Sequence, residues 1–415
     1  MKGANYQGGM GKFKGATLFL WVFFSLCTIL VLKIEARTSS ILEKEIEAKL
    51  KLLNKPAVKS IKSEDGDIFD CVDIYKQPAF DHPALRNHRI QRIPDFLLES
   101  QNSSTIETFN ASSKVFQAWQ KSGSCPEGTI PIRRIKKEDL LRAASLDRFG
   151  QKSQESFVNS THTNSDFVNL KDRSDAYLQA YGFNFIGADA NINVWNPKVD
   201  KPEDFTTAQI WLKASRGDNL ETVEAGWVVN PKLYGDHNTR LFIYWTKDTY
   251  KSTGCFDLTC SGFVQTNKGV GLGGVIGPIS TPLGQQYELN FGIYLDNGGN
   301  WWLKIKHSVP VGYWPKEFLG QSATMVQWGG QVYSHEVRKA PHTGTHMGSG
   351  EASGRFGGAC YISTVRIKDY SQMLKYPQLV YTRSAEPDCY RAFKDDGTDP
   401  LFYFGGPGRN LPHCP

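Results

Sequence analysis

From Phe167 onward, short runs of alternating apolar and polar residues follow one another, separated by turn residues. Examples are the runs 207–217, 222–229, 240–247, 287–295 and 323–333. Successive side chains of a strand point to opposite faces, so a period of two predicts strands with one face turned to a core. No stretch in this part of the chain has helical periodicity over three turns. Many short strands at this spacing predict an all-β sandwich or barrel.

One strand predicted in the stretch from Glu221 to Val264 carries a glutamate, Glu224, at a position where a half-buried strand ordinarily has no charge. Glu224 shares a strand face with Gly226 and Val228. On base rates, a charged strand residue is a solvated residue of the outer face. If it is instead held among apolar neighbours, its ionised form is disfavoured and its pKa is raised, which suits general acid and base chemistry. The opposite face of this run is apolar, with Val223, Ala225, Trp227 and Val229.

The N-terminus indicates the cellular compartment. An apolar run from residue 16 to 32 is preceded by lysines and followed by Ala36, a small cleavage-site residue. We therefore expect a secretory signal over residues 1–36 and an extracellular location, with the vacuole as an alternative destination. The run is at the lower edge of a membrane-spanning length, so contact with a membrane is expected only if the leader stays uncleaved. Three glycosylation sequons begin at Asn102, Asn110 and Asn159.

The region before the strand-rich part has a different character. Residues 39–54 place leucine and isoleucine at helical spacing and predict one amphipathic helix. Prolines interrupt the chain between residues 70 and 132, and residues 138–144 are typical of a short helix. Residues 151–165 are polar and rich in serine, which predicts an exposed linker where a protease can cut. We expect a small α+β region over residues 37–150 and a separate domain over residues 166–415.

Several short blocks recur in order over about residues 165 to 415: EAGW from Glu224, NPKLYGD from Asn230, YWT from Tyr244, GCFDLTCSGFVQT from Gly254, VGYWP from Val311, MVQWGG from Met325 and HMGSG from His346. These blocks resemble the neprosin family of plant glutamic peptidases. Residues 71–85 and 124–134 resemble the activation peptide that precedes the neprosin catalytic domain. The resemblance implies an antiparallel β-sandwich, a zymogen, and two catalytic glutamates, the first of which corresponds to Glu224.

The second family glutamate follows Trp-Gly-Gly, and in this chain that position is Gln331. A glutamine donates an N–H to a developing oxyanion, but it cannot exchange a proton as a glutamate does. Three outcomes stay open: an inactive relative, a working Glu–Gln pair like that of the fungal glutamic peptidases, or compensation by Glu336. The last is the weakest, because five residues along a strand reverse the face. Aromatic residues of the same blocks, Tyr244, Trp245 and Trp328, are candidates for a substrate groove.

Seven cysteines remain once Cys27 is assigned to the leader, so one has no partner. Sequence proximity favours a bridge from Cys255 to Cys260 and one from Cys389 to Cys414, and the family resemblance supports both. Cys71 and Cys125 are the only two cysteines before the catalytic domain and are expected to pair. Cys360 is then a free, buried thiol.

Other chemistries find little support. His342 and His346 lie in a loop and lack the helical spacing of a zinc pair, so we expect neither a metal nor a cofactor. The glycines between residues 269 and 274 are followed by Pro278 instead of the helix that a dinucleotide site needs. No G-x-S-x-G elbow occurs. The basic run at residues 133–137 leads directly into acidic residues, which is typical of a solvated helix start and not of nucleic-acid binding.

The sequence thus predicts a secreted glutamic endopeptidase, made as a zymogen, that cleaves proline-containing peptides or proteins. Glu224 would activate water, and the chain's own prosegment would act as an intramolecular inhibitor. The alternative is a weakly active or inactive secreted protein that retains the fold and binds peptides or cell-wall material.

Overall fold

The computed structural model describes Gly3 and residues 40–97, 116–152 and 171–415. The chain divides into two units, residues 1–52 and residues 53–415. A helix runs over residues 40–53, as predicted, and all but its last residue belongs to the first unit. Within the described residues, no helix combines the length and the apolar content needed to cross a membrane. The predicted leader and the sequons at Asn102, Asn110 and Asn159 lie outside the described residues.

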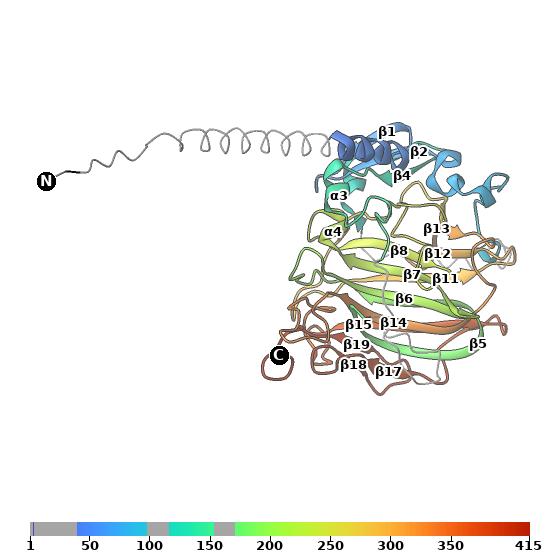
Figure 1. Cartoon of the computed structure of the whole chain (residues 1–415). Helices are drawn as coiled ribbons and strands as arrows, with labels where there is room; N and C mark the ends of the chain where they lie inside the picture. The colour runs from blue at the N-terminus through green and yellow to red at the C-terminus, as the bar shows by residue number, and fades with distance from the viewer. Residues whose placement is uncertain (1–2, 4–39, 98–115, 153–170) are drawn as a thin grey trace. The chain divides into compact units, whose positions relative to one another are not determined.

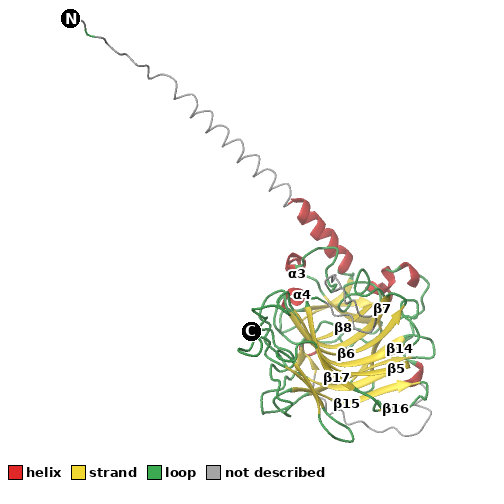
Figure 2. Cartoon of the chain, turned by 60° about the horizontal axis from the view of Figure 1, so that its bottom comes forward, coloured by secondary structure: helices red, strands yellow, loops and turns green. Residues whose placement is uncertain are grey.

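The second unit is mainly β, as predicted, and its strands and few short helices are visible in Figure 2. The α-helices are α3 (Lys137–Arg142) and α4 (Pro231–Tyr234). The strands before the predicted domain are β1 (Ala57–Lys62), β2 (Ile68–Asp73), β3 (Phe116–Gln117) and β4 (Thr129–Arg133). Those within it are β5 (Arg173–Asn193), β6 (Phe205–Arg216), β7 (Asn219–Val229), β8 (Arg240–Thr246), β9 (Val264–Gln265), β10 (Ile276–Gly277), β11 (Glu288–Leu295), β12 (Trp301–Ile305), β13 (Val309–Trp314), β14 (Ala323–Tyr333), β15 (Cys360–Asp369), β16 (Leu374–Lys375), β17 (Tyr381–Ser384), β18 (Arg391–Lys394) and β19 (Phe402–Gly405).

Strand β5 organises the large antiparallel sheet because it is long enough to be shared. Its first half pairs with β14 and β17, and its second half pairs with β11 and β15. One part of the sheet continues from β5 through β14, β6 and β7 to β8, and the other continues through β11, β12 and β13 to β9. In Figure 1 the strands from β8 to β5 follow one another down the molecule in this order. The indole N–H of Trp227 on β7 donates to Asn193 O at the end of β5, 3.0 Å away, and links the two parts.

The region before the domain forms a small unit of its own that is bonded to the domain. Strands β1, β2 and β4 make an antiparallel sheet, and its apolar cluster includes Phe69, Trp119 and the bridged Cys71 and Cys125. Strand β3 pairs with β10 of the domain. The predicted α+β character of this region is therefore confirmed. The helix predicted at residues 138–144 is α3.

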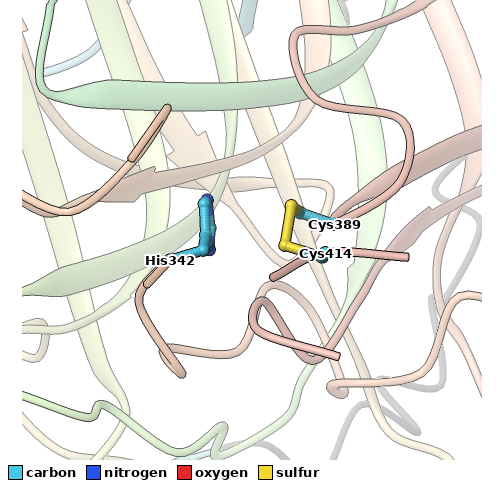
Figure 3. Close-up of side chains that lie close together, drawn as sticks. All are labelled: His342, Cys389 and Cys414. Carbon is cyan, nitrogen blue, oxygen red and sulfur yellow. A yellow bond between two sulfur atoms is a disulfide. The ribbon is translucent and has the colours of Figure 1, made fainter. Parts of the chain in front are cut away.

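All three predicted disulfides are present among the described cysteines: Cys71–Cys125, Cys255–Cys260 and Cys389–Cys414. Cys360 is free and buried, as expected. His342 lies beside the Cys389–Cys414 bridge, as Figure 3 shows, at a spacing that would suit metal ligands. Because the two sulfurs are bonded to each other, they offer no thiolates to an ion.

Candidate active site

The sheet places Glu224 and Gln331 on one face. Glu224 of β7 pairs with Trp211 of β6, and Gln331 of β14 pairs with Thr207 of the same strand. Directly opposed residues share a face, and Thr207 and Trp211 are an even number of positions apart on β6. Glu224 and Gln331 therefore both project from the face that carries Thr207 and Trp211.

The predicted aromatic groove is wrong for two of its three residues. Trp245 and Trp328 are buried in the apolar core on the opposite face of the sheet. Tyr244 pairs directly with Glu224 and lies on the Glu224 face. The period of two explains the correction, because Tyr244 and Trp245 are consecutive and cannot face the same side.

The carboxylate of Glu224 is fully buried and accepts four hydrogen bonds from described side chains. The hydroxyl groups of Tyr250 and Thr222 donate to Oε1 at 2.6 and 3.0 Å. The amide of Gln209 donates to Oε2 at 2.7 Å, and the ammonium of Lys152 donates to the same oxygen at 2.5 Å. A carboxylate offers about four lone-pair sites, so this group has a donor for each one.

Lys152 belongs to the segment that precedes the domain, and its side chain is fully buried. Its backbone N–H donates to the hydroxyl of Tyr244 at 3.1 Å, and its ammonium lies 4.5 Å from the centre of the Tyr244 ring. The rings of Tyr250 and Phe256 are 5.4 and 5.7 Å away, so three aromatic rings and one carboxylate surround the charge. The residue falls in the predicted exposed linker, but the structure places it inside the molecule.

The pKa of Glu224 moves in the direction opposite to the one expected from its apolar strand neighbours. Burial on its own raises the pKa, but the ammonium of Lys152 and the hydrogen bonds from Lys152 and Tyr250 outweigh burial and lower the pKa to about 2. Burial lowers the pKa of Lys152 to about 8, although Glu224 opposes that change. With Lys152 in place, Glu224 is held as an anion.

Gln331 has different surroundings. Its side chain is 3% exposed, and its Nε2 donates to Oδ1 of Asp175 on β5 at 2.8 Å. Its Oε1 has no hydrogen-bond partner among the described residues. Glu336, the weakest of the candidate replacements, lies beyond the end of β14 and pairs with Lys201 at 2.5 Å. The carboxyl nearest to Gln331 in sheet register is therefore that of Asp175.

A buried ion network joins the small N-terminal sheet to the domain. The guanidinium of Arg240 on β8 binds Asp67, which lies between β1 and β2, and also binds Asp236. Arg133 on β4 donates to Asp67 at 3.1 Å and to the backbone oxygen of Tyr234 at 3.2 Å. These contacts hold the segment that leads to Lys152 against the domain.

Sequence reasoning singled out Glu224 and Gln331, but it missed the groups that surround them. Thr222 was identifiable as a same-face neighbour two residues before Glu224. No sequence signal distinguished Lys152, Tyr250 or Asp175, because each reaches the site through tertiary packing.

The comparison with family models agrees with the residue pattern. A model described as Neprosin matches residues 202–407, and one described as Neprosin activation peptide matches residues 60–179. The chain belongs to the neprosin family of peptidases and carries that family's activation peptide. The small sheet and Lys152 lie within the activation-peptide match, and Glu224 and Gln331 lie within the other.

Three solved structures are similar at low identity. Scytalido-glutamic peptidase with a peptide-based transition-state analogue shares 9% identity at a TM-score of 0.30, and 56% of this chain and 97% of that chain are covered. The same peptidase with a transition-state analogue inhibitor has 9% identity and a TM-score of 0.32, with 56% and 98% covered. SCP-B, a member of the Eqolisin family of peptidases in complex with the tripeptide Ala-Ile-His, has 8% identity and a TM-score of 0.28, with 57% and 98% covered. Overlaps at this level establish no residue correspondence.

Proposed function

We propose that this protein is the zymogen of a secreted glutamic endopeptidase in which Glu224 is the catalytic carboxyl. The observation that carries the proposal is the contact between Lys152 and Glu224. A fully buried carboxylate on the sheet has its fourth hydrogen bond supplied by a lysine of the activation peptide. Removal of that lysine leaves a buried carboxyl without its counterion, which is the state that general acid and base catalysis needs.

The chemistry follows from the two residue types. Once Lys152 has left, burial is no longer opposed by an ammonium, and the pKa of Glu224 rises. Glu224 takes a proton from a water whose oxygen adds to the scissile carbonyl carbon. An N–H of Gln331 binds the oxyanion. When the tetrahedral intermediate collapses, the carbon–nitrogen bond breaks and Glu224 returns the proton to the leaving amine.

The activation peptide then acts as an intramolecular inhibitor whose release depends on the charge of Glu224. Acid favours release, because protonation of Glu224 removes the attraction that holds the Lys152 ammonium in a buried site. An extended peptide containing proline is the proposed substrate, since it can lie across the face that carries Tyr244 and Gln331. Three disulfides among the described residues support passage through the secretory pathway.

A second candidate function is peptide binding without turnover. The observation that favours it is Gln331, which cannot carry a proton at the position where the family has its second glutamate. In that case the sheet face would hold a peptide or cell-wall ligand, and Glu224 would contribute only a hydrogen-bond acceptor.

Acid incubation of the purified full-length protein with a proline-rich peptide library tests the proposal. We expect peptide cleavage together with a new N-terminus that lies after Lys152, measured by N-terminal sequencing. Cleavage products that also form with Glu224→Gln would refute the catalytic assignment. Release of the activation peptide and tight peptide binding without any products would establish the binding function instead.

A further inference from the structure

Among the described strands, the sheet register brings one carboxyl, that of Asp175, to Gln331. Strand β5 pairs with β14 so that Asp175 lies directly opposite Gln331, and the amide nitrogen donates to Asp175 Oδ1 at 2.8 Å. Asp175 is partly exposed, whereas Gln331 is almost fully buried. Where the family has one glutamate, this chain therefore presents an amide and a carboxyl in contact.

The contact fixes which end of the amide faces Asp175. An ionised carboxylate only accepts hydrogen bonds, so the nitrogen of Gln331 must face it and the oxygen must point away. The amide nitrogen carries two N–H groups, and the bond to Asp175 uses one of them. The second N–H is left to bind another acceptor. An amide rotated by half a turn would instead present its oxygen, which repels an oxyanion.

We propose that Asp175 is a positioning residue that holds the amide of Gln331 with an N–H available to the oxyanion. This inference rests on the proposed function and names the group that allows glutamine to serve at this position. Asp175 acts through Gln331 and does not itself exchange the proton, which stays with Glu224. The pair supplies the oxyanion-binding half of the site as one unit.

Three positive groups, from the strand of Asp175 and from neighbouring strands, lie around Asp175. Arg173 and Tyr177 lie two residues to either side of it on β5 and share its face. Arg383 of β17 pairs with Tyr177, and Lys213 of β6 is close enough to interact with the Asp175 charge. Asp175 therefore accepts from Gln331 in surroundings that also hold three cationic side chains.

The arrangement changes the effect expected of Gln331→Glu, the substitution that restores the family's residue. It would place two carboxyls within hydrogen-bond distance, where they can be accommodated only by sharing one proton. At neutral pH the pair would repel, and the repulsion would disappear in acid. Asp175→Asn should remove the conflict, so the double variant should carry the family's glutamate without the repulsion.

Activity of the matured protein on a proline-containing peptide tests the positioning role. Removing a single oxyanion donor costs about 100-fold or more in kcat. Asp175→Asn keeps the Gln331 donor but replaces a group that only accepts with an amide that can either accept or donate, so the orientation of Gln331 is no longer fixed. We therefore expect a fall of about tenfold in kcat with little change in KM. Gln331→Glu should raise kcat in the Asp175→Asn background but not in the parent. Asp172→Asn, a carboxyl just before β5 that binds His335, is the matched control and should behave as the parent.

Thermal unfolding of the full-length protein between pH 4 and pH 7 tests the contact without relying on turnover. One carboxyl of the Gln331→Glu pair has its pKa raised, so the variant should melt below the parent at pH 7 and approach it as the pH falls. The double variant should lose this pH dependence. Full kcat in Asp175→Asn, or a Gln331→Glu melting profile parallel to that of the parent, would overturn the inference. A parent without turnover refutes the proposed function and the positioning role together, whereas turnover with unchanged Asp175→Asn refutes the positioning role alone.

Discussion

The Glu224 and Gln331 positions lie on the same sheet face but are held in different ways. Glu224 receives donors from β6, from its own strand, from the Tyr250 loop and from the activation peptide. Gln331 has Asp175 as its described hydrogen-bond partner, and Asp175 lies on β5 of the large sheet, although it also falls within the activation-peptide match. Glu224 therefore depends on a lysine from outside the large sheet, whereas Gln331 is organised by a neighbouring strand of that sheet.

This difference separates the groups that keep the zymogen inactive from the groups that set the geometry for catalysis. Residues that act through Glu224 should change both the stability of the zymogen and the pH at which activity appears. Residues that act through Gln331 should change turnover with little effect on release of the activation peptide.

Lys152→Met keeps the length and apolar stem of the side chain but removes its charge. The buried carboxylate of Glu224 is then unpaired, and the loss of one partner of a buried ion pair costs about 3–5 kcal/mol. The ammonium and hydrogen bonds around Glu224 lower its pKa to about 2, below the ordinary value of 4.5. Its stabilising contribution is present above pH 4.5 and is lost as the pH falls toward 2, so the difference between variant and parent should shrink in acid.

Chemical denaturation of the full-length protein at neutral and acid pH measures this effect. Lys121→Met removes a surface charge of the activation peptide that pairs with Glu64 at 3.5 Å, and it should cost at most about 1 kcal/mol. Equal losses for the two variants at neutral pH would mean that the Lys152–Glu224 pair does not hold the zymogen together.

Glu224→Gln should reduce peptide hydrolysis by the matured protein at least about 100-fold, because the site loses the group that takes and returns the proton. Steady-state kinetics on a proline-containing peptide provides the measurement. Glu336→Gln is the matched control, since Glu336 forms an ion pair with Lys201 beyond the end of β14, and its kcat should equal that of the parent. Comparable losses in both variants would count against a special role for Glu224.

Tyr250→Phe removes one donor to Glu224 and leaves the ring in place. A hydrogen bond to a charged group contributes about 1.5–3 kcal/mol, so the pKa of Glu224 should rise by about one to two units, and the pH–rate profile should shift to higher pH with it. Tyr361→Phe on β15 is the matched control. It removes a comparable hydrogen bond, from the Tyr361 hydroxyl to Glu288 at 2.7 Å. Both variants should melt at a lower temperature, but only Tyr250→Phe should shift the pH–rate profile.

Much of the fold was predictable because strand periodicity is a local signal. The alternating runs gave the strands of the large sheet, and cysteine proximity gave two of the three bridges. The same periodicity, applied strictly, would have separated Tyr244 from Trp245 and prevented the error in the predicted groove. Glu224 and Gln331 were both singled out from the sequence blocks that contain them.

The contacts of the site were not predictable in the same way. Lys152 comes from a polar segment that resembles an ordinary linker, and it reaches Glu224 across 72 residues of sequence. Asp175 becomes a neighbour of Gln331 only through the register of β5 and β14. The expected rise in the pKa of Glu224 was wrong because strand neighbours alone omit the ammonium that the activation peptide supplies.

The consequence of the activating cleavage depends on whether the chain is cut before or after Lys152. If the chain is cut before Lys152, the lysine stays covalently attached to the domain and competes with substrate as a tethered ligand. Short flexible tethers give effective concentrations on the order of millimolar, which dilution of the protein does not reduce. If the chain is cut after Lys152, the lysine becomes part of a separate molecule, and its occupancy falls as that molecule is diluted. The site of the cut therefore determines whether self-inhibition of the activated protein persists on dilution or is lost.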